Sequence, residues 1–249
     1  MFLPQTAQSD YEELCCMDVL GIQDTPSGDQ KVVHEEFLEQ LRRDPVHGWF
    51  ETGLPFKGGH PPLLSNEDIS LKRFGTLVQR LKKTDKFNEY DSIIQEQLKE
   101  GIVEPANQPP TGTVFYLPHH PVIRESSEST KMRIVYDVSS KTGSQPSLND
   151  CLNTGPPLQN QLFKVLVRGR FHPVALNGDI DKAFLQVRIG PEHRDAMRFH
   201  WLEDKNPQRI CTLRFTRALF GMGPSPFLLA ATKSSRCEQR EAPQACRRN

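Results

Sequence analysis

Asp179 and Asp181 are the residues of this chain best suited to metal chemistry. They follow an apolar run that begins at Val174 and predicts a buried strand ending near Asp179. A carboxylate held at the end of a core strand suits a hard divalent cation such as Mg²⁺, which binds carboxylate and phosphate oxygens in octahedral geometry. An Asp in this position also commonly accepts a backbone N–H in a turn or at a helix start, so the spacing alone leaves both interpretations open.

Two cationic side chains suggest a phosphate contact. Lys131 and Arg133 lie on the segment Lys131–Val138, which predicts a strand, and the period of two places them on the same face. The segment follows a polar loop, Glu125–Thr130. Two cations beside such a loop could bind phosphate, although exposed cations are also common on strands without any ligand.

A glycine-rich turn precedes the last predicted helix. Gly221 and Gly223 would let the backbone approach a ligand closely, and a helix is predicted from about Pro226 to Thr232. An ordinary turn between a strand and a helix, without any ligand, explains the same pattern equally well.

Length and composition constrain the fold only loosely. The 249 residues allow one or two domains, and the low mean hydropathy of -0.56 together with 20 prolines suggests that part of the chain is extended. Lysine plus arginine equals aspartate plus glutamate at 31 each, so net charge gives no general signal for nucleic acid. Any basic groove must therefore come from local arrangement.

The six cysteines include no Cys-x-x-Cys pair, which argues against a zinc knuckle or a disulfide framework. We expect an intracellular, cytoplasmic location, because no signal peptide pattern and no apolar run of membrane-spanning length are present. We expect no membrane partner for the same reason. The sequence does not indicate an oligomeric state.

The elements before residue 101 are mainly helical. Periodic apolar residues predict helices over Val32–Arg43 and Phe87–Lys99, the second ending at Gly101, and a strand near Trp49–Phe56. Ser65 is the expected N-cap of another amphipathic helix that runs to about Lys83. The polar face of that helix is basic and consists of Lys72, Arg73, Arg80, Lys82 and Lys83.

Strands dominate beyond residue 101. Besides the strands already named, we predict strands at Thr113–Leu117 and Pro121–Arg124, and a hairpin of Ala196–Trp201 with Arg209–Phe215. A helix over Leu158–Gly169 is expected to bury Leu162, Val165 and Leu166. The adjacent His119 and His120 should point to opposite faces of a strand and are poor joint metal ligands.

Five segments, in this order and spacing, resemble the reverse transcriptase of long-terminal-repeat retrotransposons, most closely the BEL/Pao group. The resemblance covers roughly residues 70 to 235. The segments are Arg80–Lys83 with Leu98–Glu104, Tyr116–Val122, Lys131–Asp137, Asp179–Val187, and Leu219–Met222 with Ser225–Phe227.

The resemblance implies an α+β chain with an incomplete right-hand polymerase fold. This fold would comprise the fingers and a partial palm, with an antiparallel sheet and packed helices. It divides the chain into a linker region with short helices, partly disordered, at residues 1–64, a reverse transcriptase region at 65–235, and a disordered, non-homologous tail at 236–249. Its partners would be an RNA or DNA primer–template and a deoxynucleoside triphosphate.

The resemblance also implies roles for individual residues. Asp179 would be the catalytic aspartate that binds Mg²⁺, or Mn²⁺ in its place, with help from the backbone carbonyl of Ile180. Phe184 would be the aromatic gate that rejects a 2′-hydroxyl. The triphosphate and the rest of the nucleotide would contact Lys182, Ala183, Phe184, Arg133, Lys131, Phe220 and Gly221.

One family motif is not found. An aromatic-x-Asp-Asp hairpin should follow Phe227, yet the sequence contains no Asp-Asp pair. The loop at Glu125–Thr130 also lacks the lysines common in related polymerases. We therefore expect a remnant of an RNA-directed DNA polymerase of a retrotransposon polyprotein that is catalytically inactive alone. The alternatives are a non-catalytic nucleic-acid-binding remnant and a functionless pseudogene product.

Overall fold

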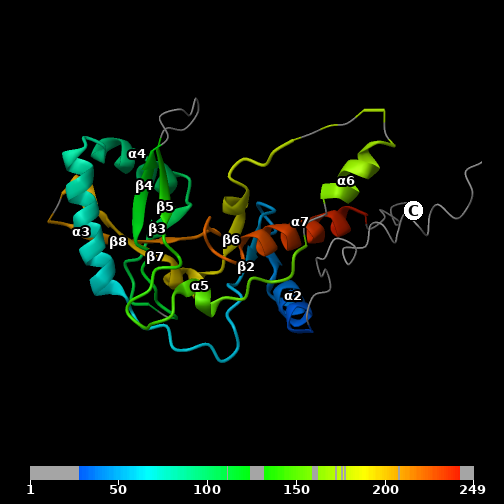
Figure 1. The fold of residues 1–249 in the computed structure, drawn as a ribbon, viewed down its shortest axis with the longest axis horizontal. Helices are drawn as coiled ribbons and strands as arrows, with labels where there is room; N and C mark the ends of the chain where they lie inside the picture. The colour runs from blue at the N-terminus through cyan, green and yellow to red at the C-terminus, as the bar shows by residue number, and fades with distance from the viewer. Residues whose placement is uncertain are drawn as a thin grey trace, which may run out of the picture.

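The structure is a computed structural model that describes residues 28–110, 112–123, 132–158, 162–171, 173–174, 176, 178–206 and 208–241 (Figure 1). The helices are α2 (Gly28–Gln40), α3 (Glu67–Lys83), α4 (Phe87–Lys99), α5 (Leu148–Cys151), α6 (Leu162–Gly169) and α7 (Ser225–Glu241). The 3₁₀ helices are η2 (Ala183–Gln186), η3 (Pro191–Met197) and η4 (Glu203–Lys205). The strands are β1 (Arg42–Arg43), β2 (Phe50–Thr52), β3 (Val103–Pro105), β4 (His119–Ile123), β5 (Met132–Tyr136), β6 (Val187–Ile189), β7 (Arg198–Leu202) and β8 (Ile210–Phe215).

The strands form small sheets in the orders β1-β2-β6, β3-β8-β7 and β4-β5. All pairings are antiparallel except that of β2 with β6, which is parallel. Helices and mainly antiparallel sheets are mixed along the chain, so the α+β class predicted from the sequence is confirmed. The predicted hairpin of β7 and β8 and the predicted strands β4 and β5 are also present.

Helix α3 packs against β7, and α4 packs against β3 and β5 (Figure 1). An amphipathic pattern explains this placement, because Phe74 and Leu81 on α3 and Tyr90 on α4 are buried. Trp201 of β7 lies under both helices, with ring centroids 5.2 Å from Tyr90 and 5.7 Å from Phe87. The aromatic side chains therefore join the helices to the sheet.

The start of α3 differs from the prediction by one residue. Asn66, and not Ser65, is the N-cap, and the Asn66 side chain does not cap the helix. It donates to the backbone carbonyl of Tyr116 at 2.7 Å and accepts from the backbone N–H of the same residue at 2.8 Å. A tertiary contact thus replaces the local cap.

Three predictions about strands and burial are wrong. Thr113–Leu117 is not a strand, because only Tyr116 forms an isolated bridge, to Arg198. The described residues of the segment 173–180 form no strand, and Leu176 is 96 % exposed. Helix α6 forms, but its expected core residues are exposed, among them Leu162 at 72 %. The apolar residues of the segment 173–180 and of α6 were expected to be buried, but no described element covers them.

The two ends of the described chain also differ from expectation. β2, which belongs to the predicted linker at 1–64, pairs with β6, and Phe37 of α2 packs edge to face on Phe227 at 5.2 Å. Helix α7 continues to Glu241, so the first part of the predicted disordered tail is helical. Residues 242–249 lie outside the described residues. Among the described helices, none combines the length and apolar character needed to cross a bilayer.

Candidate functional site

The carboxylate proposed as catalytic lies in an exposed turn. Asp179 is exposed, and its Oδ1 accepts the backbone N–H of Ile180 at 2.8 Å. Asp181 is also exposed, and its backbone carbonyl accepts from the side chain of Gln186 at 3.3 Å. The expected buried strand that would hold Asp179 rigidly is absent, because no described strand pairs with the segment before it.

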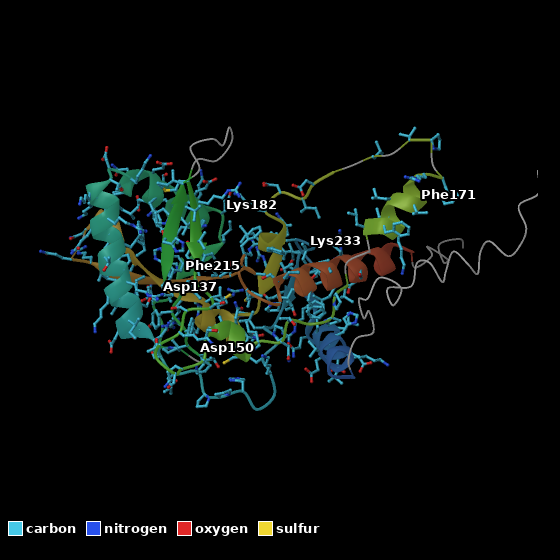
Figure 2. All side chains as sticks on the ribbon, viewed as in Figure 1. Asp137, Asp150, Phe171, Lys182, Phe215 and Lys233 are labelled. Carbon is cyan, nitrogen blue, oxygen red and sulfur yellow. The ribbon has the colours of Figure 1, made fainter. Side chains whose placement is uncertain are left out.

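The turn that follows is held by an ion pair with α4. Lys182 has a left-handed backbone, with φ +48°, and begins η2. Its Nζ lies 3.1 Å from Oε2 of Glu100, directly after α4, and the hydrogen bond to this carboxylate raises the pKa of the lysine. Figure 2 shows Lys182 above the centre of the molecule, at the end of the exposed segment. A residue that was expected to face phosphate is thus neutralised by a carboxylate in this structure.

Two predicted site residues, 36 positions apart in the sequence, meet in space. Phe184 of η2 and Phe220 pack edge to face, with ring centroids 4.6 Å apart and an angle of 64° between the planes. Phe220 stays 63 % exposed. The pair therefore presents apolar aromatic surface to solvent next to the Lys182 turn. A planar ligand such as a nucleobase could pack on this surface.

The loop after Phe220 is clamped by Asn149, a residue that sequence reasoning missed. The Asn149 side chain donates to the backbone carbonyl of Gly221 at 2.8 Å and accepts from the N–H of Gly223 at 2.9 Å. Gly221 has φ +85°, a conformation that favours glycine. A capping box of Ser147 with Asp150 positions α5, which carries Asn149. In the sequence, the spacing of Ser147 and Asp150 could have indicated the short helix α5, but it does not indicate the contacts of Asn149.

The cationic strand residues are not brought into the same cluster. Arg133 is exposed on β5 opposite Val122 of β4, and no contact joins it to Phe184 or to Asp179 in the described chain. Lys131 lies outside the described residues. His119 is buried and His120 is exposed, so the prediction that they face opposite sides is confirmed.

The donor set near Asp179 does not form a complete metal site. Within the ranges that the structure describes, no group of three or more His, Cys, Asp or Glu side chains could hold an ion. Asp179 and Asp181 alone offer too few oxygens for two Mg²⁺ ions that must also bind phosphates.

A second candidate surface lies beside α3. A cavity of about 250 Å³ is lined by Arg73, Thr76, Leu77, Arg80, Pro118, His119, His120 and Asp137. Arg73 donates to Asp137 at 3.3 Å and to Ser140 at 2.9 Å, whereas Arg80 has no ion pair in the part of the chain that the structure describes. Arg80 and His120 are exposed polar groups that a phosphate could reach.

Comparison with known proteins adds no assignment. No protein-family model matches the sequence, and a search of curated proteins finds no match. The functional interpretation therefore depends on the motifs and on the geometry described above.

Proposed function

We propose that this chain is the fingers and partial palm of a reverse-transcriptase-type polymerase, with a right-hand polymerase fold, that binds a deoxynucleoside triphosphate and a primer–template. The observation that supports this proposal best is the contact between Phe184 and Phe220. The family resemblance implies that both rings flank one nucleotide, and the fold brings them within 4.6 Å of each other.

The neighbouring groups suit the same ligand. The family resemblance implies that the backbone amides of Lys182 to Phe184 hold the triphosphate, and these residues lie at the start of η2 beside Phe220. Gly221 leaves space next to Phe220 for a sugar or base. Lys182 would have to exchange Glu100 for phosphate, a swap between two anionic partners that an exposed lysine makes at low cost.

Chemistry requires more than the described residues supply. Asp179 and the carbonyl of Ile180 would hold Mg²⁺ or Mn²⁺, which would neutralise the triphosphate when bound. Transfer in this family needs a second set of carboxylates, and no Asp-Asp pair occurs in the sequence. We propose that the chain alone binds nucleotide and primer–template but does not extend the primer.

Nucleotide binding and extension should be measured separately. We expect the chain to bind deoxythymidine triphosphate in the presence of Mg²⁺, and Phe184→Ala to weaken this binding about tenfold through loss of ring stacking. Phe163→Ala, an exposed ring on α6, is the control and should bind as the unmodified chain does. Absence of nucleotide binding would refute the proposal, and primer extension that depends on Asp179 would refute the inactivity.

A non-catalytic nucleic-acid-binding function is the second candidate, supported by the basic cavity beside α3. Arg80→Gln should weaken primer–template binding at every sequence tested and lower the slope of log affinity against log salt by about one. Lys164→Gln, on the exposed face of α6, is the control. Absence of binding even at low salt would leave the functionless alternative.

A further inference from the structure

Two arginines face each other on neighbouring backbone segments behind η2. Arg188 of β6 and Arg217 form an isolated antiparallel bridge. Residues directly opposite in such a bridge have Cβ atoms about 5 Å apart, and like charges there repel. The arrangement is therefore unfavourable unless an anion lies nearby.

No carboxylate in the described chain pairs with either arginine. Glu51 is the cross-strand neighbour of Arg188, but its carboxylate accepts from Arg194 at 3.3 Å instead. Among the described residues, the Arg217 side chain donates to the backbone carbonyl of Leu185, at 3.3 Å. The Nε atoms of Arg188 and Arg217 are buried and have no hydrogen-bond partner among the residues that the structure describes.

Trp49 holds the arginine pair in place. The Arg188 guanidinium carbon lies 3.4 Å from the ring centroid, and that of Arg217 lies 5.7 Å from it. His47 stacks on the same ring at 4.4 Å. Because His47 and Arg188 would overlap on one face at these distances, they occupy opposite faces, and the tryptophan fixes the guanidinium geometry before any ligand arrives.

Burial makes the charge more costly. Arg217 is 9 % exposed, and desolvation together with Arg188 and Arg194 lowers its pKa to about 10. Desolvation also lowers the pKa of Arg188, which nevertheless remains partly exposed. Arg188 is therefore the arginine of the pair that a ligand can approach from solvent, with Arg217 opposite it in the bridge.

We propose that Arg188 and Arg217 form a binding site for a dianionic phosphate, either inorganic phosphate or the terminal phosphate of an ester. A dianion matches two guanidinium groups that have no direct ion pair in the described chain, since Asp44, Glu51 and Glu100 act on them only at longer range, whereas a carboxylate or a phosphodiester supplies only one negative charge. Guanidinium forks bind phosphate oxygens bidentately. The site shares no residue with the proposed nucleotide contacts at Phe184 and Phe220, so either proposal can fail without the other.

A cavity also lies next to Trp49. It has a volume of about 440 Å³ and is lined in part by His47, Trp49, Gln186 and Lys233, whereas neither arginine lines it, so the proposed site rests on the arginine pair alone. Lys233 is exposed and adds a further cation (Figure 2).

The first experiment compares thermal unfolding of the full chain in phosphate and in chloride at equal ionic strength and pH. We expect a saturable rise of about 2 °C or more in phosphate. Arg188→Gln and Arg217→Gln should lose this rise, and Arg170→Gln, an exposed arginine without a side-chain partner in the described chain, should keep it. Equal midpoints in the two buffers, or a rise that persists in both variants, would overturn the proposal.

A folding check is built into the variants. Removing one of two facing like charges should leave each variant at least as stable in chloride as the unmodified chain. If one variant fails to fold, Arg188→Lys replaces it, because lysine keeps the charge but lacks the bidentate guanidinium group. We expect this variant to bind phosphate at least several times more weakly than the unmodified chain. Unchanged affinity in that variant would count against the site.

A second experiment identifies the source of the phosphate. Binding of an oligothymidine with a 5′-phosphate is compared with binding of the same oligonucleotide without it. Recognition of a monoester predicts binding about tenfold tighter with the 5′-phosphate. Binding of inorganic phosphate without this preference assigns the site to the free ion. If both oligonucleotides bind equally and inorganic phosphate does not raise the unfolding temperature, the proposed phosphate site is refuted.

Discussion

Phe184 and Phe220 meet edge to face across two separate backbone segments, with ring centroids 4.6 Å apart. Phe184 belongs to η2, and Phe220 lies just before the Gly221 turn. Each segment is anchored independently, the first by the Lys182–Glu100 ion pair and the second by Asn149. The ring contact therefore links the two halves of the candidate site, beside the hydrogen bond that Arg217 donates to the Leu185 carbonyl.

We predict that this contact is energetically specific. A double-mutant cycle of Phe184→Ala and Phe220→Ala should give a coupling of about 0.5–1.5 kcal/mol in the free energy of unfolding, measured by urea denaturation. Phe184→Ala combined with Phe163→Ala should be additive within about 0.5 kcal/mol, because Phe163 lies on α6 and makes no ring contact in the described chain. Additivity of the first pair would show that the rings do not interact in solution.

The Asn149 clamp gives a second prediction. Asn149→Ala leaves the Gly221 carbonyl and the Gly223 N–H without their partner and should cost about 1–3 kcal/mol of stability. Hydrogen exchange at the Gly223 amide should become faster.

The matched control for this clamp is Asn153→Ala. Asn149 and Asn153 both line a cavity of about 230 Å³ that is also bordered by Lys57 and Gly155, but the Asn153 side chain makes no hydrogen bond in the described chain. We expect this variant to change stability by less than about 0.5 kcal/mol. Equal costs for the two asparagines would show that the cavity, and not the clamp, determines the stability of the loop.

The sequence predicts local features of this fold well. Helix α4 has the predicted limits, Phe87–Lys99, because its apolar period and the glycine after it are both encoded within one segment. Burial depends on partners that a local pattern does not specify. The apolar run from Val174 needs a neighbouring strand, and no described strand supplies one, so Val174 is 71 % exposed.

The end of α7 shows a second limit of sequence reasoning. The lack of apolar residues after Arg236 predicts disorder, but an existing helix gains one hydrogen bond for each added residue, and Arg, Gln and Glu are good helix formers. The candidate site shows the same difference between local sequence patterns, which can be recognised, and tertiary contacts, which cannot. The motif resemblance proposed Phe184 and Phe220 as site residues, whereas the contacts of Glu100 with Lys182 and of Asn149 with the Gly221 loop are tertiary contacts that the sequence does not specify.

A buried ion-pair network gives a third prediction. Asp195 is 1 % exposed, and its Oδ1 accepts from Arg198 at 2.8 Å and from Arg214 at 2.8 Å. Asp195→Ala removes the shared anion and should cost about 3–5 kcal/mol in the free energy of unfolding, because the buried Arg198 loses its carboxylate partner, whereas Arg214 keeps its ion pair with Glu104. Glu203→Ala, at an exposed acidic position, should change stability by less than about 0.5 kcal/mol in the same urea titration. A small effect at Asp195 would mean that water compensates the arginines.

The last prediction concerns pH. Burial lowers the pKa of His119 to about 4, and the neutral ring accepts from the Tyr90 hydroxyl and donates through Nε2 to the carbonyl of His200 at 3.0 Å. Unfolding restores an ordinary pKa of about 6.5, so the unfolded chain binds a proton at a pH where the folded chain does not. The contribution is fully present above about pH 6.5 and is lost as the pH falls towards 4, by about 3 kcal/mol in total.

The measurement is the free energy of unfolding in urea between pH 7 and pH 4 for the unmodified chain, His119→Gln and His120→Gln. His119→Gln should have a shallower decline over this range, because it removes the largest buried histidine contribution. His120 is exposed on the same strand and serves as the control, so its replacement should leave the slope unchanged. Burial also lowers the pKa of His193 and of His200, and hydrogen bonds from Lys141 and Ser147 lower that of Asp150 to about 2, so these groups contribute to the decline that remains. If all three proteins share one slope, protonation of His119 does not oppose folding, and the ring is hydrated in solution.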